Sequence, residues 1–235
     1  MEQKKTEETA ILMAAGLGSR MRPLTEYTPK PLIPVHGIPM IETVIHGLQK
    51  RGVREIYIVT GYLGEQFERL CDKYENVHIL KNPDYLTKNN ISSIYAAREI
   101  LGRTDTFICE SDLFVADESI FLKELSHSCY YGRMQKGYSD DWVFDLENGR
   151  ISRIGKGGTD TYNMVGIAYF KQKDAKILNE EIMKAYEKEE SSDLFWDDVV
   201  NQNLDKLDLT IEPIQEGQLV EIDTVEELEK INESR

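Results

Sequence analysis

The sequence predicts an α/β protein with a Rossmann-like, doubly wound and mostly parallel sheet and a small antiparallel lid. Short, nearly continuous apolar strands alternate with amphipathic helices over residues 9–125, which is typical of a parallel sheet covered by helices on both faces. After about residue 125 this alternation gives way to a hairpin pattern. No Pro/Gly/Ser-rich linker or internal repeat separates the two parts. We therefore expect a single domain over residues 1–235, with halves at about 9–125 and 126–235.

Each element of the first half follows from its local sequence. The apolar run AILMAAG predicts a buried strand, and IPMIETVIHGLQKRG predicts an amphipathic helix that ends at Gly52. Next come a strand in REIYIVTGY, a helix in LGEQFERLCDKY and a strand in VHILKNP. A helix is expected in NNISSIYAAREIL, with Asn89 or Asn90 as its N-cap, and a fourth strand in DTFICESDLFV. Right-handed crossovers in such a sheet place ligands at the carboxyl ends of the strands.

The second half predicts shorter and more varied elements. The stretch DWVFDLENGRISRIG predicts a hairpin that turns at residues 147–149. A strand in MVGIAYF, a charged helix over residues 173–190 and a helix in SDLFWDDVVNQNL follow. Short strands in LTIEPIQ and LVEID precede a last helix, TVEELEKINES, in which Thr224 is the cap and Glu227 stands three residues later.

Composition limits the partners and the compartment. The 235 residues carry a formal net charge of -14, which argues against a nucleic acid or an anionic membrane as partner. Three cysteines at unhelpful spacings, with no Cys/His cluster, indicate free thiols in a reducing compartment. The polar start MEQKKTEETA predicts no signal peptide. No apolar run approaches the roughly 20 residues of a membrane span. We expect a cytoplasmic protein.

Residues 14–35 form the most informative stretch of the chain. Gly16 and Gly18 allow positive φ and let backbone N–H groups approach a polyanion. Arg20 and Lys30 supply positive charge, while three X-Pro steps stiffen the return of the loop. The stretch lacks the Gly-Lys-Ser/Thr of a Walker A loop and the third glycine of a dinucleotide fingerprint. It predicts a phosphate-binding loop of another kind.

The same residues resemble the signature of a known family. LMAAGLGSRMRPLTEYTPKPLIPV is similar to the pattern G-x-G-[ST]-R-x-x-P-x-T-x-x-x-P-K-P of the nucleotidyltransferases that make nucleoside-diphosphate sugars and cholines. The similarity continues through VTGYLGEQFE, NNISSIY, ESDLF and VEIDTVEEL, over nearly the whole chain. Within that family the chain looks most like the short bacterial CTP:phosphocholine cytidylyltransferases of the LicC type. The resemblance implies metal-dependent transfer of a nucleotidyl group with release of pyrophosphate.

Nucleotidyl transfer requires a cation among several phosphates, so we expect Mg²⁺ held by carboxylates. Asp112, near the end of a buried strand, matches the family's metal aspartate, and Glu110 stands two residues earlier on the same face. Asp223 matches the second metal carboxylate, although its place beside a helix start would also suit a cap.

The resemblance also implies the residues that hold the nucleotide. Arg20 and Lys30 are the expected catalytic cations, and Gly18 and Ser19 belong to the same phosphate loop. The base is expected between the backbone of the first loop and the start of the third helix; the residues implied there are Ala14, Ala15, Gly16, Asn89, Asn90 and Ser92. The two asparagines could equally be only a helix cap, and cytosine over uracil rests on the resemblance alone.

The acceptor side contains the two tryptophans of the chain. Trp142 and Trp196 both stand beside carboxylates, in SDDWVFD and DLFWDDV. Aromatic faces suit a quaternary ammonium, and the LicC-like resemblance implies such a pocket, so we expect Trp142 and Trp196 to form a cage. Tyr162 or Tyr138 would complete its wall, with Asp141 nearby. Asp197 or Asp198, beside Trp196, would serve the substrate or the metal. The alternative is that each tryptophan is an ordinary core residue.

The expected reaction is direct in-line transfer of CMP from CTP to phosphocholine, giving CDP-choline and pyrophosphate. The first alternative acceptor is 2-aminoethylphosphonate or phosphoethanolamine, whose primary ammonium would suit Asp140 and Asp141 as hydrogen-bond acceptors. A sugar-1-phosphate transferase and a non-catalytic nucleotide-binding regulator are weaker alternatives. The sequence leaves the oligomeric state and the pathway open.

Overall fold

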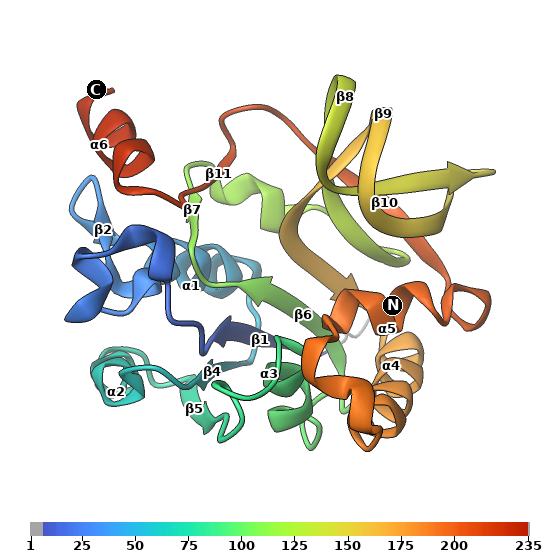
Figure 1. Cartoon of the computed structure of the whole chain (residues 1–235), viewed down its shortest axis with the longest axis horizontal. Coiled ribbons are helices and arrows are strands. Elements are labelled where there is room, and N and C mark those ends of the chain that lie inside the picture. The colour runs from blue at the N-terminus through green and yellow to red at the C-terminus, as the bar shows by residue number, and fades with distance from the viewer. Residues whose placement is uncertain (1–6, 235) are drawn as a thin grey trace, which may run out of the picture.

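A seven-stranded sheet forms the centre of the computed structural model, which describes residues 7–234 (Figure 1). Residues 1–6 and 235, and with them most of the polar start judged for a signal peptide, lie outside the described part. The strand order is β10-β8-β9-β6-β1-β4-β5. These strands are β1 (Glu8–Ala14), β4 (Glu55–Thr60), β5 (Val77–Lys81), β6 (Asp105–Glu110), β8 (Ser128–Glu147), β9 (Arg150–Phe170) and β10 (Leu209–Ile214). Only β9 runs antiparallel to its neighbours, β6 and β8. The mostly parallel sheet is confirmed.

Helices cover both faces of the sheet because its strands are apolar on both sides. The helices are α1 (Met40–Arg51), α2 (Glu68–Lys73), α3 (Ile91–Ala96), α4 (Gln172–Tyr186), α5 (Trp196–Asn201) and α6 (Val225–Glu233). Ala10 and Leu12 of β1 share a core cluster with α1 and α2, whereas Ile11 between them packs with α3, α4 and α5. Alternate residues of one strand thus supply two cores, as a doubly wound sheet requires. Among the described residues, no helix is long and apolar enough to cross a membrane.

Several predicted ends and turns are confirmed. Helix α1 ends at Gly52, whose φ of 89° is the left-handed cap that glycine favours. Helix α6 begins with the predicted capping box, in which Thr224 and Glu227 exchange side-chain and backbone hydrogen bonds. The β8–β9 hairpin turns at Asn148 and Gly149, both with positive φ, as a two-residue turn requires.

The predicted fourth strand is wrong in one respect, because the structure divides it. Strand β6 ends at Glu110, and β7 (Leu113–Val115) leaves the main sheet to pair antiparallel with β11 (Leu219–Glu221). The Ser111 hydroxyl donates to the carbonyl oxygen of Met13 at this break. A separate short pair joins β2 (Pro34–Val35) to β3 (Ile38–Pro39). The break carries Asp112 away from the sheet and towards the segment that follows β11.

The outer part of the β8–β9 hairpin, residues 133–164, is the predicted antiparallel region and is called the lid below. Its strands bulge and fold over themselves, so that Val143 pairs with both Asn163 and Gly155. In Figure 1 the lid stands beside the central sheet, on the side opposite β2 and α6. The lid thus lies at the β8–β9 side of the sheet, away from α6.

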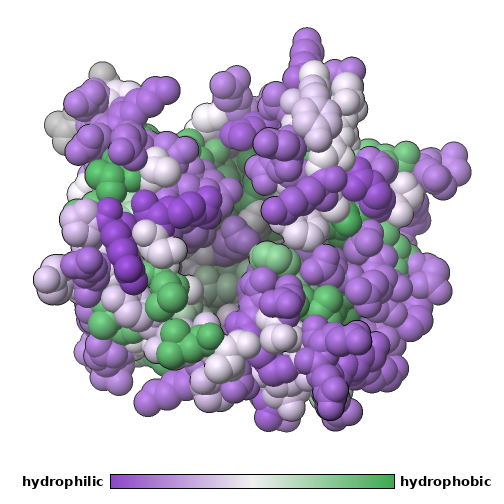
Figure 2. Space-filling model, in the orientation of Figure 1, coloured by the Kyte–Doolittle hydropathy of each residue, from purple (hydrophilic) through white to green (hydrophobic). Residues whose placement is uncertain are grey.

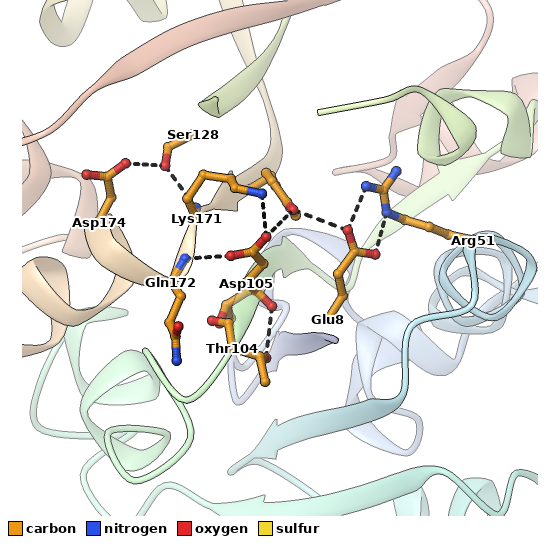
Figure 3. A network of polar contacts seen from close by, with 10 residues as sticks. Glu8, Arg51, Thr104, Asp105, Ser128, Lys171, Gln172 and Asp174 are labelled. Atoms are coloured by element: carbon orange, nitrogen blue, oxygen red, sulfur yellow. Dashed lines mark hydrogen bonds and ion pairs between the residues drawn. The ribbon is translucent and has the colours of Figure 1, made fainter. Parts of the chain in front are cut away.

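A buried polar network lies at the opposite, amino-terminal edge of the sheet (Figure 3). Glu8 begins β1 and Asp105 begins β6. Arg51 donates to both carboxylate oxygens of Glu8 at 2.7 Å, and the Tyr169 hydroxyl donates to Asp105 at 2.9 Å. Lys171 also donates to Asp105. The network ties β1, β6, β9 and α1 together at the end of the sheet away from the cleft described next.

Candidate active site

A cleft of about 360 Å³ opens at the carboxyl ends of β1 and β6. Figure 2 shows this face of the molecule hollowed at its middle, between the part that carries α6 and the lid. Its volume lies in the range of small-molecule sites. The cleft wall consists of Met13, Ala14, Ala15, Gly16, Gly18, Ser19, Arg20, Lys30, Pro31, Asn89, Asn90, Ser93, Glu110, Asp112, Phe195, Glu221 and Asp223.

The two loop glycines have different roles. Gly18 has a φ of 60°, and a Cβ there would lie 2.9 Å from Cβ of Lys30, so both conformation and space require glycine. Gly16 is not among the positive-φ glycines of the described residues, and the prediction of positive φ was wrong for it. A Cβ on Gly16 would meet no atom within 4 Å. Because Gly16 lines the cleft, its missing side chain leaves room for a ligand.

Lys30 joins the two predicted metal carboxylates. Its Nζ donates to Asp112 at 2.6 Å and to Asp223 at 2.7 Å, and Arg20 pairs with Asp223 at 2.7 Å. Burial opposes the charge of Lys30, but Asp112 and Asp223 outweigh it and raise the pKa of the ammonium. Lys30 therefore stays charged, and the prolines beside it hold that charge in the cleft.

A third carboxylate, which the sequence did not single out, completes this group. Oxygen atoms of Asp112, Glu221 and Asp223 all lie within 4.8 Å of one another. Glu221 is accessible to solvent but lies in the concave cleft wall. Lost hydration, followed by the charges of Asp112, Asp223 and more weakly Asp141, raises the pKa of Glu221 to about 7. Its place two residues before Asp223, at the end of β11, was the available sequence signal.

These three residues fit a magnesium ion by the chemistry of their donors. Carboxylate oxygens are the hard ligands that Mg²⁺ prefers, and Lys30 and Arg20 can offset only two of the three negative charges gathered here. Asp223 is not the cap of α6, the alternative role that the sequence left open, because Thr224 caps that helix.

Glu110 occupies the floor of the cleft. Burial, followed by the charge of Asp112, raises the pKa of Glu110 well above its usual value. Gly166 of β9 makes room for this side chain, since a Cβ at Gly166 would lie 3.0 Å from Oε2 of Glu110.

A side pocket of about 160 Å³ adjoins the cleft near the predicted base-binding residues. It is lined by Ala15, Gly16, Asn82, Tyr85, Lys88, Asn89, Asn90, Ser92 and Ser93. Asn90 begins α3 without a side-chain cap; its Oδ1 instead accepts the N–H of Trp196 at 3.0 Å. Ser92 donates to the carbonyl of Asn89 at 2.7 Å. The structure thus brings both asparagines, Ser92 and the loop backbone together.

The predicted acceptor residues are divided. Trp196 is 4% exposed and stacks on Tyr130, with ring centroids 5.7 Å apart and an interplanar angle of 15°. It lies in the core of this structure and not in the main cleft wall. Trp142 is half-buried and packs edge-to-face on Phe195 at 5.6 Å. Phe195 was not predicted, yet it is the aromatic residue that lines the cleft among those described.

The other three acceptor candidates differ in environment. Asp141 is exposed on the lid, where its Oδ1 accepts the N–H of Trp142 at 2.8 Å. Tyr162 packs against Gly132 of β8 and is half-buried. Asp197 is 5% exposed and accepts the Tyr130 hydroxyl at 3.0 Å. Burial raises the pKa of Asp197 to about 7, although the hydrogen bond from Tyr130 opposes the shift.

Known proteins share a sequence pattern with the first half of this chain and are similar to it over most of its length. The sequence pattern of the MobA-like NTP transferase domain matches residues 10–133. The chain is 55% identical, over 93% of its length and 89% of the relative's, to a 2-aminoethylphosphonate cytidylyltransferase of Lancefieldella rimae. It is 32% identical, over 95% of its length and 96% of the relative's, to a choline-phosphate cytidylyltransferase of Streptococcus pneumoniae.

Solved structures agree at the level of the fold. The CTP:phosphocholine cytidylyltransferase of Streptococcus pneumoniae superposes with a TM-score of 0.89 at 32% identity, covering 97% of this chain and 99% of that one. A glucose-1-phosphate thymidylyltransferase described from Bacillus anthracis gives a TM-score of 0.78 at 20% identity over 97% of this chain and 94% of that one, which bears on the fold alone.

Proposed function

Because the chain belongs to the MobA-like NTP transferase family and is a nucleotidyltransferase of the cytidylyltransferase type, we propose that it transfers CMP from CTP to 2-aminoethylphosphonate. The products are a CMP-phosphonate and pyrophosphate. The observation that carries the choice of acceptor is the cleft wall, which offers several carboxylates but only Phe195 as an aromatic face among the described residues.

The nucleotide end of the proposal rests on the loop and the side pocket. Backbone N–H groups of the loop, with Arg20, would bind the triphosphate, and Asn89, Asn90 and Ser92 would flank the base, because these residues line the cleft or its side pocket. Lys30 is buried and charged, so it is placed to stabilise the charge that shifts at the α-phosphorus during transfer.

We propose that Asp112 and Asp223, with Glu221 beside them, hold a magnesium ion. Such an ion would draw the phosphate groups together and withdraw charge from the reacting phosphorus. Lys30 and Arg20 keep these carboxylates oriented by the ion pairs described above.

The transfer needs no enzyme nucleophile. An acceptor phosphonate oxygen forms the new bond to the α-phosphorus, while the bond from that phosphorus to the bridging oxygen breaks and pyrophosphate leaves with the electron pair. The dianionic acceptor carries no proton on the attacking oxygen, so no general base is required. The described cleft wall contains neither Cys nor His, in keeping with direct transfer.

The acceptor's ammonium group favours the aminoethyl compound. A primary ammonium has three N–H donors that need acceptors, whereas a trimethylammonium group needs aromatic faces. Behind the cleft floor, a recess of about 10 Å³ lies among Met13, Glu110, Tyr130, Met164, Gly166, Ile167, Trp196 and Asp197. That volume suits about one water-sized group. The recess shares Met13 and Glu110 with the cleft wall, so we assign Asp197 to the acceptor side with Asp141 at the lid.

Phosphocholine remains the second candidate. The edge-to-face pair of Trp142 and Phe195 at the cleft border would provide aromatic surface for a quaternary ammonium, and a relative named for choline phosphate matches 95% of the chain. The buried position of Trp196 weighs against a three-sided cage.

A pyrophosphate-release panel tests the proposal. With CTP and Mg²⁺, kcat/KM for 2-aminoethylphosphonate should exceed that for phosphocholine by at least about 10-fold. This factor corresponds to a free-energy difference of about 1.4 kcal/mol. Phosphoethanolamine should rank between them, and glucose-1-phosphate should be inactive.

Two variants separate the candidates. Asp197→Asn should lower kcat/KM for the primary amine more than for phosphocholine, because it removes a negative charge near the ammonium. Trp142→Ala should have the opposite ranking if the lid aromatics recognise choline. A wild-type enzyme that prefers phosphocholine, together with choline-selective loss in Trp142→Ala, would establish the second candidate instead.

A further inference from the structure

We infer that contacts between residues 84–98 and residues 186–196 couple the nucleotide and acceptor sites, with Asn90 as the positioning residue between them. The first segment follows β5 and carries the side pocket. The second segment contains the 3-10 turn Glu189–Asp193 and leads to Phe195 in the cleft wall. We call these contacts the clasp.

The clasp joins parts of the chain about a hundred residues apart through several independent contacts. The backbone N–H of Asn89 donates to the carbonyl of Ser192 at 2.7 Å, and its side chain donates to the carbonyl of Asp193 at 3.3 Å. Lys88 contacts the Ser191 hydroxyl. Tyr95 and Tyr186 stack with centroids 3.7 Å apart, and the Tyr186 hydroxyl donates to Asp84.

Polar contacts hold the second segment more than burial does. Residues 187–190 and 192–193 are exposed, and Ser191 is the one fully buried residue between Tyr186 and Phe195 in the described chain. A segment with few apolar contacts opens readily, so its position depends on the groups that bind it. Those groups lie between Asp84 and Tyr95, with Lys88, Asn89 and Asn90 nearest the side pocket.

Both ends of the clasp reach a ligand-binding surface. Lys88, Asn89 and Asn90 line the side pocket next to Ala15 and Gly16. At the other end, Asn90 accepts the N–H of Trp196, directly after Phe195 in the cleft wall. A nucleotide that fixes Asn89 and Asn90 therefore also fixes Phe195, and Phe195 in turn packs against Trp142 of the lid. Nucleotide binding should thus organise the acceptor side before the acceptor arrives.

Hydrogen–deuterium exchange with CTP and Mg²⁺, in the absence of acceptor, tests the coupling in the full chain. CTP should slow exchange in residues 14–22 and 84–93, which face the nucleotide. The inference requires that it also slow exchange in residues 187–196 by at least about 5-fold, the lower end of typical coupling between sites. Protection of the first two segments without the third would overturn it. Protection of none would overturn the nucleotide assignment and this inference together.

Variants outside both pockets provide the second readout. Tyr186→Phe removes the hydrogen bond to Asp84 and keeps the stack on Tyr95. Ser191→Ala removes the contact with Lys88 and the hydrogen bond to the carbonyl of Tyr186. Combined, they should raise KM for the acceptor about 5- to 10-fold at saturating CTP, leave the Kd for CTP within about 2-fold and abolish the CTP-induced protection of residues 187–196.

The matched control is Tyr74→Phe. It also removes one tyrosine hydroxyl from a carboxylate, that of Glu42 at 2.6 Å, but on the face covered by α1 and α2. It should leave acceptor KM and CTP-induced protection unchanged. Equal effects of Tyr74→Phe and the clasp variant would show loss of general stability and would refute the coupling, as would an unchanged acceptor KM in the clasp variant.

Discussion

At the scale of single residues, the space around a side chain decides which substitutions the candidate site tolerates. A Cβ atom on Gly18 would clash with Lys30, whereas a Cβ atom on Gly16 would meet no other atom within 4 Å. The same contrast between a filled and an open environment distinguishes the buried carboxyl of Asp197 from the exposed one of Asp141. Two predictions follow from the surroundings of these side chains.

Alanine at each loop glycine should give different defects. Gly16→Ala should fold with unchanged stability but weaken CTP binding, because the new methyl group projects into the cleft. Gly18→Ala should lower the free energy of unfolding by roughly 1 to 2 kcal/mol for a left-handed alanine and lower kcat as well, because Lys30 must move. Urea unfolding and CTP titration check both. Equal stability of the two variants would contradict the assignment.

Asp197 should make stability depend on pH. Its pKa is raised by burial to about 7, above the value of an unfolded aspartate, so its contribution to stability is present at low pH and is lost as pH rises towards 7. Asp197→Asn should therefore be more stable than the wild type at pH 8. Its advantage should shrink by roughly 2 to 3 kcal/mol at pH 5.

Chemical unfolding of the wild type and Asp197→Asn at the two pH values measures this difference. The Asp145→Asn change, at an exposed lid carboxylate, provides the control and should show little such pH dependence. A constant difference between Asp197→Asn and the wild type at both pH values would show that Asp197 titrates normally.

At the scale of elements, short segments after β11 and β6 carry Asp223 and Asp112, two carboxylates of the proposed metal site. The capping box of α6 does more than start a helix, because Glu227 Oε2 accepts the backbone N–H of Asp223 at 2.7 Å as well as that of Thr224 at 3.0 Å. The helix cap thus fixes the residue whose carboxylate pairs with Lys30. The capping residue Glu227 therefore also positions the backbone of a residue in the proposed metal site.

Removal of Glu227 should loosen the metal site without removing a ligand. Glu227→Ala should raise the Mg²⁺ concentration needed for half-maximal activity several-fold while kcat at saturating Mg²⁺ changes little. The neighbouring Glu226→Ala removes the same charge from the first turn of α6 but no bond to Asp223, and should leave the Mg²⁺ dependence unchanged. Identical curves for the two variants would refute a positioning role.

At the scale of the whole molecule, the candidate active site and the buried polar network lie at opposite edges of the sheet. Its carboxyl edge holds the exposed Gly16 and a group of crowded carboxylates. Its amino edge holds the buried network of Figure 3, in which Glu8, Arg51 and Asp105 satisfy one another through Tyr169. The network contributes to the stability of the fold, whereas the charged residues of the cleft line the proposed substrate site.

Disruption of the network should therefore lower stability and spare catalysis. Arg51→Met leaves Glu8 buried without its ion pair and removes donors to the carbonyls of Phe121 and Lys123, which should cost about 3 to 5 kcal/mol. The kcat per folded molecule should remain that of the wild type. Arg54→Ala, which breaks an exposed pair with Glu7, should cost no more than about 1 kcal/mol. A large loss of kcat in Arg51→Met would contradict the separation.

The sequence by itself determined the alternating strands and helices, and it singled out Lys30, Asp112 and Asp223, which the structure brings together in the cleft wall. These features are local, because they rest on apolar periodicity and on residues that restrict the backbone. Only the tertiary structure decided that the strand breaks at Ser111, that Glu221 and Phe195 join the cleft wall, and that Trp196 packs on Tyr130. Those outcomes depend on partners far away in the chain, and no local pattern reports which face of a short segment those partners will cover.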